Sequence, residues 1–134
     1  MSSVTTTEYA NRVRLNVPFQ QAIDKMIQAL KAEGFGVLTE IDMQGTLKQK
    51  LGVEIRPYLI LGVCHPPFAQ RALAADPDAG LLLPCNVAVY EDGDHTVVSI
   101  LDPVAMLKIT ENSAMHAVGA EAKQKLDRVL AAIA

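Results

Sequence analysis

The chain has 134 residues, of which 50% are hydrophobic, 20% are charged and 4% are aromatic, and its formal net charge is −3. This length predicts one domain spanning residues 1–134, which can bury enough surface to fold without disulfides or structural metals. The acidic balance, with no cluster of Lys and Arg, argues against nucleic acid or an anionic membrane as a partner.

The first residues, 1–7, show no charged segment followed by an apolar one, so we expect no secretory signal. The longest apolar runs, such as 59–64, are far shorter than the roughly 20 residues that a membrane span needs. Two cysteines without a secretory signal are typical of reduced thiols. We therefore expect a soluble protein of the cytoplasm.

The first third of the chain predicts a strand, a helix, a strand and a short helix. Residues 11–17 alternate between apolar and polar side chains, as a half-buried strand does. Apolar residues then recur at three- and four-residue steps between Pro18 and Gly34, which indicates an amphipathic helix. A second strand is expected over 35–41, followed by a helix over 42–51, with Asp42 able to cap it and Gly52 able to end it.

The middle of the chain holds a strand and a helix with clear boundaries. Residues 58–64 are almost wholly apolar, which is typical of a strand covered on both faces. A helix is expected over 66–75, with a proline at its start. A turn follows, and a strand lies within 81–91, where Pro84 demands a sheet edge, a bulge or a later start.

The last third predicts a hairpin and a long helix. Residues 92–94 form a tight turn into a strand over 96–101, and a short helical segment follows through 108. A long helix begins near Ser113, with Glu121 and Lys125 spaced to form an ion pair. Together these elements predict an α+β fold of two layers, in which one central sheet of about five strands, with an antiparallel hairpin, packs against helices.

Cys64 is the first residue with candidate chemistry, because it ends a strand and is followed by His65, Pro66 and Pro67. If a helix begins at Pro66, free N–H groups and the positive end of the helix dipole face the thiol and lower its pKa. A protonated His65 would favour the thiolate further. The alternative is that Cys64 is a small hydrophobic residue and His65 only caps the helix.

Cys85, within Leu83-Pro84-Cys85-Asn86, permits two geometries. If its strand runs antiparallel to 58–64, the two cysteines are neighbours and share a pocket, a redox couple or a soft-metal site. If the connection is a parallel crossover, the cysteines lie at opposite ends of the sheet, about 20 Å apart. The sequence leaves both geometries open.

Glu40 and Asp42 end the second strand, where alternate residues point the same way. Such a pair could bind a cation or raise one carboxyl pKa. The alternative is a helix cap beside a solvated charge. A zinc site would need three or four convergent ligands, and the spacing of Cys and His here indicates one only weakly. The sequence leaves the identity of any metal or cofactor open.

A set of residues spread over essentially the whole chain forms one pattern: Gly34-Phe35, Val37-Leu38, Glu40-Ile41-Asp42, Tyr58, Ile60-Leu61-Gly62, Cys64, Pro66, Asp76-Pro77, Gly80 to Val87, Asp102-Pro103 and Met106. In these residues the chain resembles the domain of unknown function 302 family of bacteria and archaea. The resemblance implies a small α+β domain without an established activity. The family motif maps onto Glu40, Asp42, Cys64, Pro66, Pro84 and Cys85, and His65 replaces the Asn usual in the family.

Three functions follow from these residues, and they leave open whether the protein is an enzyme. In the first, a pocket holds a small ligand or a soft metal, and its candidate residues are Glu40, Asp42, Cys64, His65, Pro66 and Cys85. In the second, the protein is a thiol redox enzyme in which Cys64 attacks and Cys85 resolves. In the third, the cysteines are inert in a structural or self-association module. The high apolar fraction also leads us to expect a homodimer.

Overall fold

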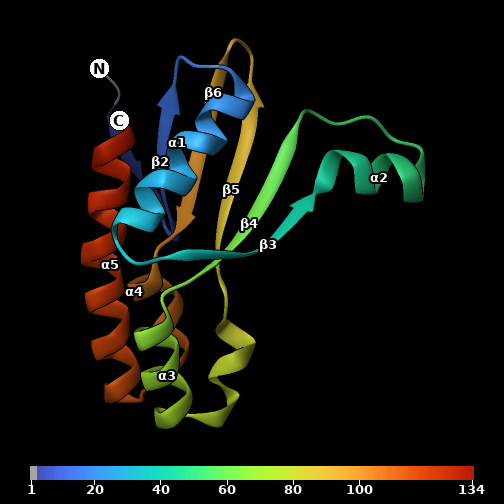
Figure 1. Cartoon of the computed structure of the whole chain (residues 1–134). Helices are drawn as coiled ribbons and strands as arrows, with labels where there is room; N and C mark the ends of the chain where they lie inside the picture. The colour runs from blue at the N-terminus through green and yellow to red at the C-terminus, as the bar shows by residue number, and fades with distance from the viewer. Residues whose placement is uncertain (1–2) are drawn as a thin grey trace.

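The centre of the computed structural model, which describes residues 3–134, is a six-stranded sheet in the order β1-β2-β6-β5-β4-β3 (Figure 1). Every neighbouring pair of strands is antiparallel. The strands are β1 Val4–Thr6, β2 Ala10–Leu15, β3 Gly36–Asp42, β4 Tyr58–Cys64, β5 Cys85–Asp92 and β6 His95–Leu101. The predicted α+β sheet is confirmed, with six strands in place of about five. The additional strand is β1.

The helices divide into a layer on the sheet, a group below it and one outlier. They are α1 Phe19–Ala32, α2 Met43–Leu51, α3 Pro66–Ala75, α4 Pro103–Met106 and α5 Ser113–Ile133, with 3₁₀ turns η1 Pro77–Leu82 and η2 Leu107–Ile109. Helices α1 and α5 cover one face of the sheet, and α3 and α4 lie below it beside the first half of α5 (Figure 1). This arrangement gives the protein two hydrophobic cores.

The larger core lies between the sheet and α1 and α5. It buries alternate residues of the strands, such as Val13, Leu61 and Val89, against Met26 and Leu130 of the helices. The smaller core lies below the sheet, and its buried residues are Ala72, Ala79, Leu107 and Met115. Helix α5 contributes to both cores and thus connects them.

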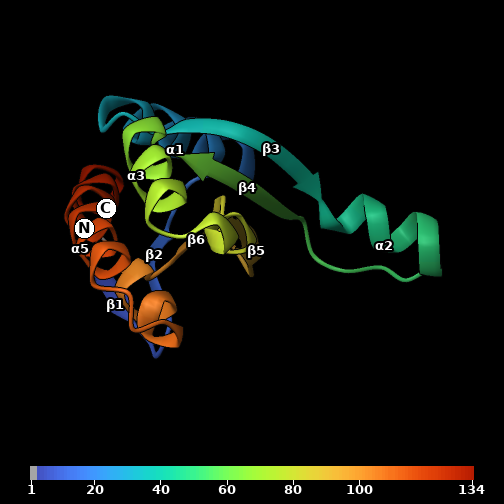
Figure 2. The same ribbon diagram turned by 90° about the horizontal axis from the view of Figure 1, so that it is seen from below.

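In the described part of the chain, residues 3–134, no helix covers the opposite face of the sheet (Figures 1 and 2). On this face Tyr58 and Ile60 of β4 stay half-buried, whereas Leu61 and Val63 on the helix side are buried. The prediction that 58–64 is covered on both faces is therefore wrong. Residues 58–64 are nevertheless apolar throughout, because the face of β4 without a helix also carries large aromatic and aliphatic side chains.

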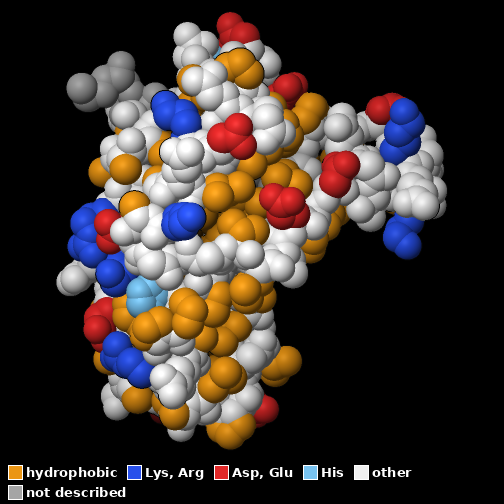
Figure 3. All heavy atoms as spheres, viewed as in Figure 1, with side chains coloured by type: hydrophobic (Ala, Val, Ile, Leu, Met, Phe, Trp, Pro, Cys, Tyr) orange, Lys and Arg blue, Asp and Glu red, His pale blue; other side chains and the backbone are white. Residues whose placement is uncertain are grey.

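Residues 38–57, which we call the arm, stand away from the rest of the molecule in both ribbon views (Figures 1 and 2). The arm contains the end of β3, helix α2 and the segment that leads into β4, and α2 buries no residue. Asp42 caps α2 by accepting a hydrogen bond from the Gly45 N–H at 3.0 Å, and Gly52 ends it, as predicted. Figure 3 shows charged side chains at the tip of the arm and hydrophobic ones gathered around α3.

Two further predictions can be compared with the structure. Strand β5 begins at Cys85, directly after Pro84, so the later start is the solution that the chain adopts. Glu121 does not pair with Lys125 but with Arg71 of α3, so that expectation is wrong. Among residues 3–134, no helix is both long and apolar enough to cross a membrane.

Candidate functional site

The register of β4 and β5 brings the two cysteines to the same end of the sheet. The strands are antiparallel, and Val63 lies directly opposite Cys85. Of the two geometries that the sequence allowed, the structure therefore adopts the one in which Cys64 and Cys85 are neighbours. Both are free thiols. Both line one cavity.

This cavity, of ≈70 Å³, lies where the two hydrophobic cores meet. Phe35, Val63 and Leu126 reach it from the larger core, and Leu107 and Met115 reach it from the smaller one. The side chains that line it and carry a nitrogen or a thiol are Cys64, His65 and Cys85, and Met106 and Met115 add thioether sulfurs, which are weak acceptors. The cavity is therefore mainly apolar.

His65 is held between two aromatic rings at the edge of this cavity. Its ring centroid lies 4.0 Å from that of Phe68 and 5.3 Å from that of Phe35. Gly34 has a φ of +86°, which favours glycine, and a Cβ there would come within 3.0 Å of His65 Nε2. Burial and the positive charge of Lys125 lower the pKa of His65, so the ring is uncharged at pH 7. Its Nδ1 is buried and finds no hydrogen-bond partner within the described residues, 3–134.

The start of α3 does not activate the Cys64 thiol in the predicted way. The helix begins at Pro66, but Pro66 and Pro67 carry no N–H. The Ala69 N–H donates to the His65 carbonyl oxygen at 3.0 Å, which leaves the Phe68 N–H as the free donor of the first turn. Burial raises the pKa of Cys64. The prediction that the helix start lowers the pKa of Cys64 is therefore wrong. Desolvation of the thiol outweighs the effect of a helix start that lacks most of its N–H donors.

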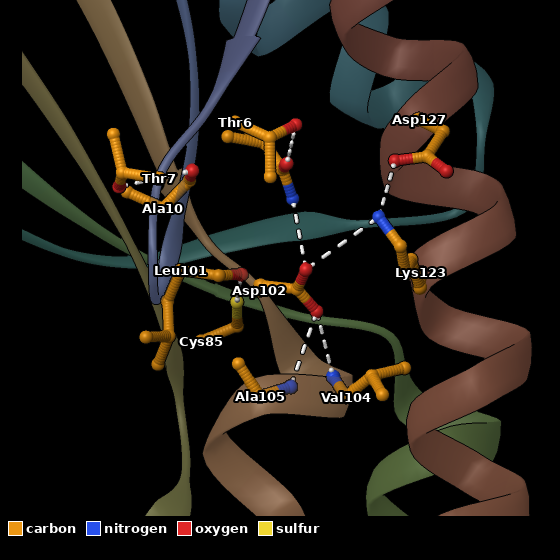
Figure 4. A network of polar contacts seen from close by, with 11 residues as sticks. Thr6, Thr7, Ala10, Cys85, Leu101, Asp102, Val104, Ala105, Lys123 and Asp127 are labelled. Atoms are coloured by element: carbon orange, nitrogen blue, oxygen red, sulfur yellow. Dashed lines mark hydrogen bonds and ion pairs between the residues drawn. The ribbon is translucent and has the colours of Figure 1, made fainter.

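The Cys85 thiol is further from ionisation. Burial raises its pKa to about 12. Its Sγ lies 4.0 Å from the carbonyl oxygen of Leu101, to which the S–H donates (Figure 4). Neither cysteine thus has the lowered pKa that is typical of a redox nucleophile.

Asp102 is the centre of a network of polar contacts directly before α4, whose residues Pro103 and Met106 line the cavity (Figure 4). Its Oδ1 accepts from the N–H groups of Val104 and Ala105 at 2.9 and 3.3 Å, which caps α4. Its Oδ2 accepts from Asn11 Nδ2 at 3.4 Å and lies 3.6 Å from Lys123 Nζ. Asp102 therefore ties β2, α4 and α5 together.

Glu40 and Asp42 lie away from the cysteines. Glu40 is opposite Leu61 and Asp42 is opposite Leu59, whereas Gly36 is the residue of β3 opposite Cys64. The two carboxylates line a separate hollow of ≈300 Å³ between α1 and the base of the arm. Of the six candidate residues, the structure thus brings Cys64, His65 and Cys85 together in the cavity. Pro66 starts α3 beside them without lining it.

No three His, Cys, Asp or Glu side chains within residues 3–134 converge in a way that could hold a metal ion. The cavity is also lined by Phe35, Phe68, Met106 and Met115, which the sequence did not predict as part of the site. A signal was present for Phe68, which follows His65 by three residues and so lies on the same side of the helix start. Phe35 and Met106 are among the residues that carry the family resemblance, and Met115 comes from α5, which is distant from the cysteines in the sequence.

Comparisons with known proteins agree with this fold. A family model described as "Domain of unknown function DUF302" matches residues 11–133. Among solved structures, an uncharacterized conserved DUF302 protein from Bacillus stearothermophilus is similar, with a TM-score of 0.88 and 26% sequence identity. The alignment covers 96% of this chain and 100% of that chain. No curated protein matches the chain.

Proposed function

This chain belongs to the DUF302 family, and we propose that it binds a small uncharged molecule in the cavity beside Cys64, His65 and Cys85. The observation that carries the proposal is the buried Nδ1 of His65, which has no hydrogen-bond partner among residues 3–134. A buried polar group without a hydrogen bond costs about 1–3 kcal/mol. A bound molecule that supplies the hydrogen bond removes this cost.

The lining of the cavity supports a ligand with an apolar body and one polar group. Its volume of ≈70 Å³ is well above the roughly 10–15 Å³ that admits a single water. Apart from the two thiols and His65, its walls are aliphatic or aromatic side chains, the thioethers of Met106 and Met115, and backbone. Because His65 is uncharged at pH 7, a charged ligand would gain no ion pair from it. We therefore prefer a small molecule to the soft metal that the sequence also suggested.

Phenol and toluene provide the test, because they differ in one hydroxyl group. Methyl-labelled methionines report where each probe binds, since Met106 and Met115 line the cavity whereas Met26 and Met43 do not. We expect both probes to shift the methyl NMR signals of Met106 and Met115 and to leave the other two unchanged. The hydrogen bond to His65 should make phenol bind about 3- to 10-fold more tightly than toluene.

Two variants control this experiment. His65→Phe retains an aromatic ring between Phe35 and Phe68 but removes Nδ1, so the affinity for phenol should fall to that for toluene. Ala122→Leu places a larger side chain in the cavity wall and should prevent both probes from binding. Binding of neither probe to the wild-type protein, or an unchanged preference for phenol in His65→Phe, would contradict the proposal.

We propose no reaction for the thiols, because burial raises the pKa of both Cys64 and Cys85. A thiol redox enzyme relies on a thiolate, which a raised pKa disfavours at neutral pH. Two free cysteines are consistent with a reducing compartment, and we propose the cytoplasm as the location.

We also propose that two copies of the chain pair through their arms. The arm exposes Leu38, Ile41, Leu51 and Val53, and 69% of Leu51 is accessible to solvent. Helix α2 has nine residues, whereas isolated helices shorter than about 12–15 residues are marginal in water. Pairing about a two-fold axis would cover both arms with the same contacts.

Leu51→Glu should dissociate this dimer. Removing two buried leucines from a symmetric interface is expected to weaken the dimer by about 100-fold or more. Sedimentation equilibrium should give the wild-type protein twice the 14.4 kDa mass of the chain, and the variant the mass of one chain. Leu81→Glu is the matched control, since Leu81 is 86% exposed on η1, away from the arm. A monomeric wild-type protein, or equal dissociation in the control, would refute arm pairing.

A further inference from the structure

Two buried side-chain nitrogens lack a hydrogen-bond partner among residues 3–134: His65 Nδ1 and Arg12 Nε. The first belongs to the cavity described above. The second lies at a different hollow, of ≈350 Å³, on the face of the sheet that no helix covers. This hollow is within the range of about 300–1,000 Å³ that is typical of small-molecule sites.

The hollow exists because small side chains alternate with large ones across the sheet. In the middle row, Arg12 of β2 lies opposite Ser99, Ser99 lies opposite Ala88, and Ala88 lies opposite Ile60. Residues paired in this way share one face of a sheet. The rows on either side carry larger residues, including Tyr90 and Tyr58 in one, and Leu101 and Asn86 in the other. Ser99 and Ala88 thus form a low floor between two higher walls.

All three tyrosines of the chain line this hollow. The rings of Tyr58 and Tyr90 stack with a centroid separation of 5.3 Å and an interplanar angle of 4°. Burial, with Tyr90 and Tyr9 close by, raises the pKa of Tyr58, so its hydroxyl group remains a donor. One wall is therefore aromatic and carries a hydroxyl group at its edge.

The positive charge of Arg12 is not neutralised within the described part of the chain. The other arginines of this face, Arg14 and Arg56, both lie near the carboxylate of Asp92, at 3.5 and 3.8 Å. The side chain of Arg12 forms no ion pair with any of residues 3–134, and its Nε donates no hydrogen bond to them. A guanidinium group presents a planar fork that matches a carboxylate.

We propose that this hollow binds a small aromatic carboxylate. The carboxylate pairs with the guanidinium group of Arg12, and the ring packs against the stacked Tyr58 and Tyr90. Ser99 and Asn86 offer further hydrogen bonds from the floor and the second wall. A single negative charge suits the site better than a phosphate, because within residues 3–134 Arg12 is the one arginine of this face that forms no ion pair with a carboxylate.

Benzoate is the probe, and benzamide is its neutral counterpart of the same shape. In the wild-type protein, we expect benzoate to shift the NMR signal of the Arg12 Nε–H in a saturable manner. Arg12→Gln should weaken benzoate binding at least tenfold, whereas the weak binding of benzamide should change less than twofold. Arg14→Gln is the matched control, since it removes an arginine from the same strand and face, two residues away. It should retain benzoate affinity within twofold.

Three outcomes would overturn the inference. Equal loss of benzoate binding in Arg12→Gln and Arg14→Gln would indicate general attraction to a basic surface. Benzoate-dependent shifts at Met106 and Met115 that His65→Phe abolishes would place the probe in the other cavity. A change in sedimentation mass caused by Arg12→Gln, without a change in benzoate affinity, would identify this face as a contact between copies. The phenol and toluene experiment is independent of all three.

Discussion

Asp102→Ala is expected to lower the free energy of unfolding by roughly 2–4 kcal/mol. The substitution removes the cap of α4, which alone is worth about 1 kcal/mol. It also leaves Asn11 Nδ2 and Lys123 Nζ without the carboxylate that they contact in the folded protein. Urea denaturation at pH 7 measures the loss. A loss below about 1 kcal/mol would contradict this prediction, because it would be no larger than the contribution of the cap alone.

Asp102→Asn separates the charge of this residue from its capping role, because asparagine also caps helices well. Burial raises the pKa of Asp102, but the Ala105 N–H, Lys123, Asn11 and the Val104 N–H together lower it below its usual value. A lowered pKa in the folded state stabilises the protein above the pKa of the unfolded state, about 3.9. This contribution disappears as the pH falls through the folded pKa.

The difference in stability between the wild-type protein and Asp102→Asn should therefore be largest near neutral pH. It should shrink as the pH is lowered below about 4, where the carboxyl group of the wild-type protein is protonated. Urea denaturation of both proteins across this range provides the measurement. A difference that stays constant down to the lowest pH would mean that the charge contributes nothing.

The sequence predicted elements well where prolines and apolar runs coincide. Strand 58–64 and helix 66–75 have the predicted bounds, because Pro66 can start a helix but cannot extend the preceding strand. Strand β1, Val4–Thr6, was missed, since three residues are too few to display an alternating pattern. Its position depends on pairing with β2, which is a tertiary effect.

The site was harder to predict, because both hollows combine residues from distant segments. The proximity of Cys64 and Cys85 depends on the direction of β5, which the connection between them did not specify. Alternation correctly placed Arg12 on the polar side of its strand. The hollow beside it, however, depends on the small residues Ser99 and Ala88, and only the strand order brings these next to Arg12.

Gly62→Ala is the second substitution with a large expected effect. A Cβ at Gly62 would lie 2.8 Å from Cγ of Pro84 and closer still to Oγ1 of Thr39. Overpacking of this kind costs about 1–3 kcal/mol. For a chain of this size we expect a decrease in Tm of about 4–12 °C, measured by differential scanning calorimetry. The effect arises between β4 and Pro84, directly before Cys85, so the same substitution should displace a wall of the cavity.

Gly36→Ala is the matched control for this prediction. Gly36 also lies in the sheet, but a Cβ there would meet no atom within 4 Å. Its φ is not positive, so alanine should be neutral or should stabilise the protein by up to about 1 kcal/mol through the unfolded state. Thr39→Ala in the Gly62→Ala background should recover part of the loss, because it removes one of the two clashing groups. If Gly36→Ala destabilised the protein as much as Gly62→Ala, the cost would reflect alanine in these strands and not the close approach of Pro84.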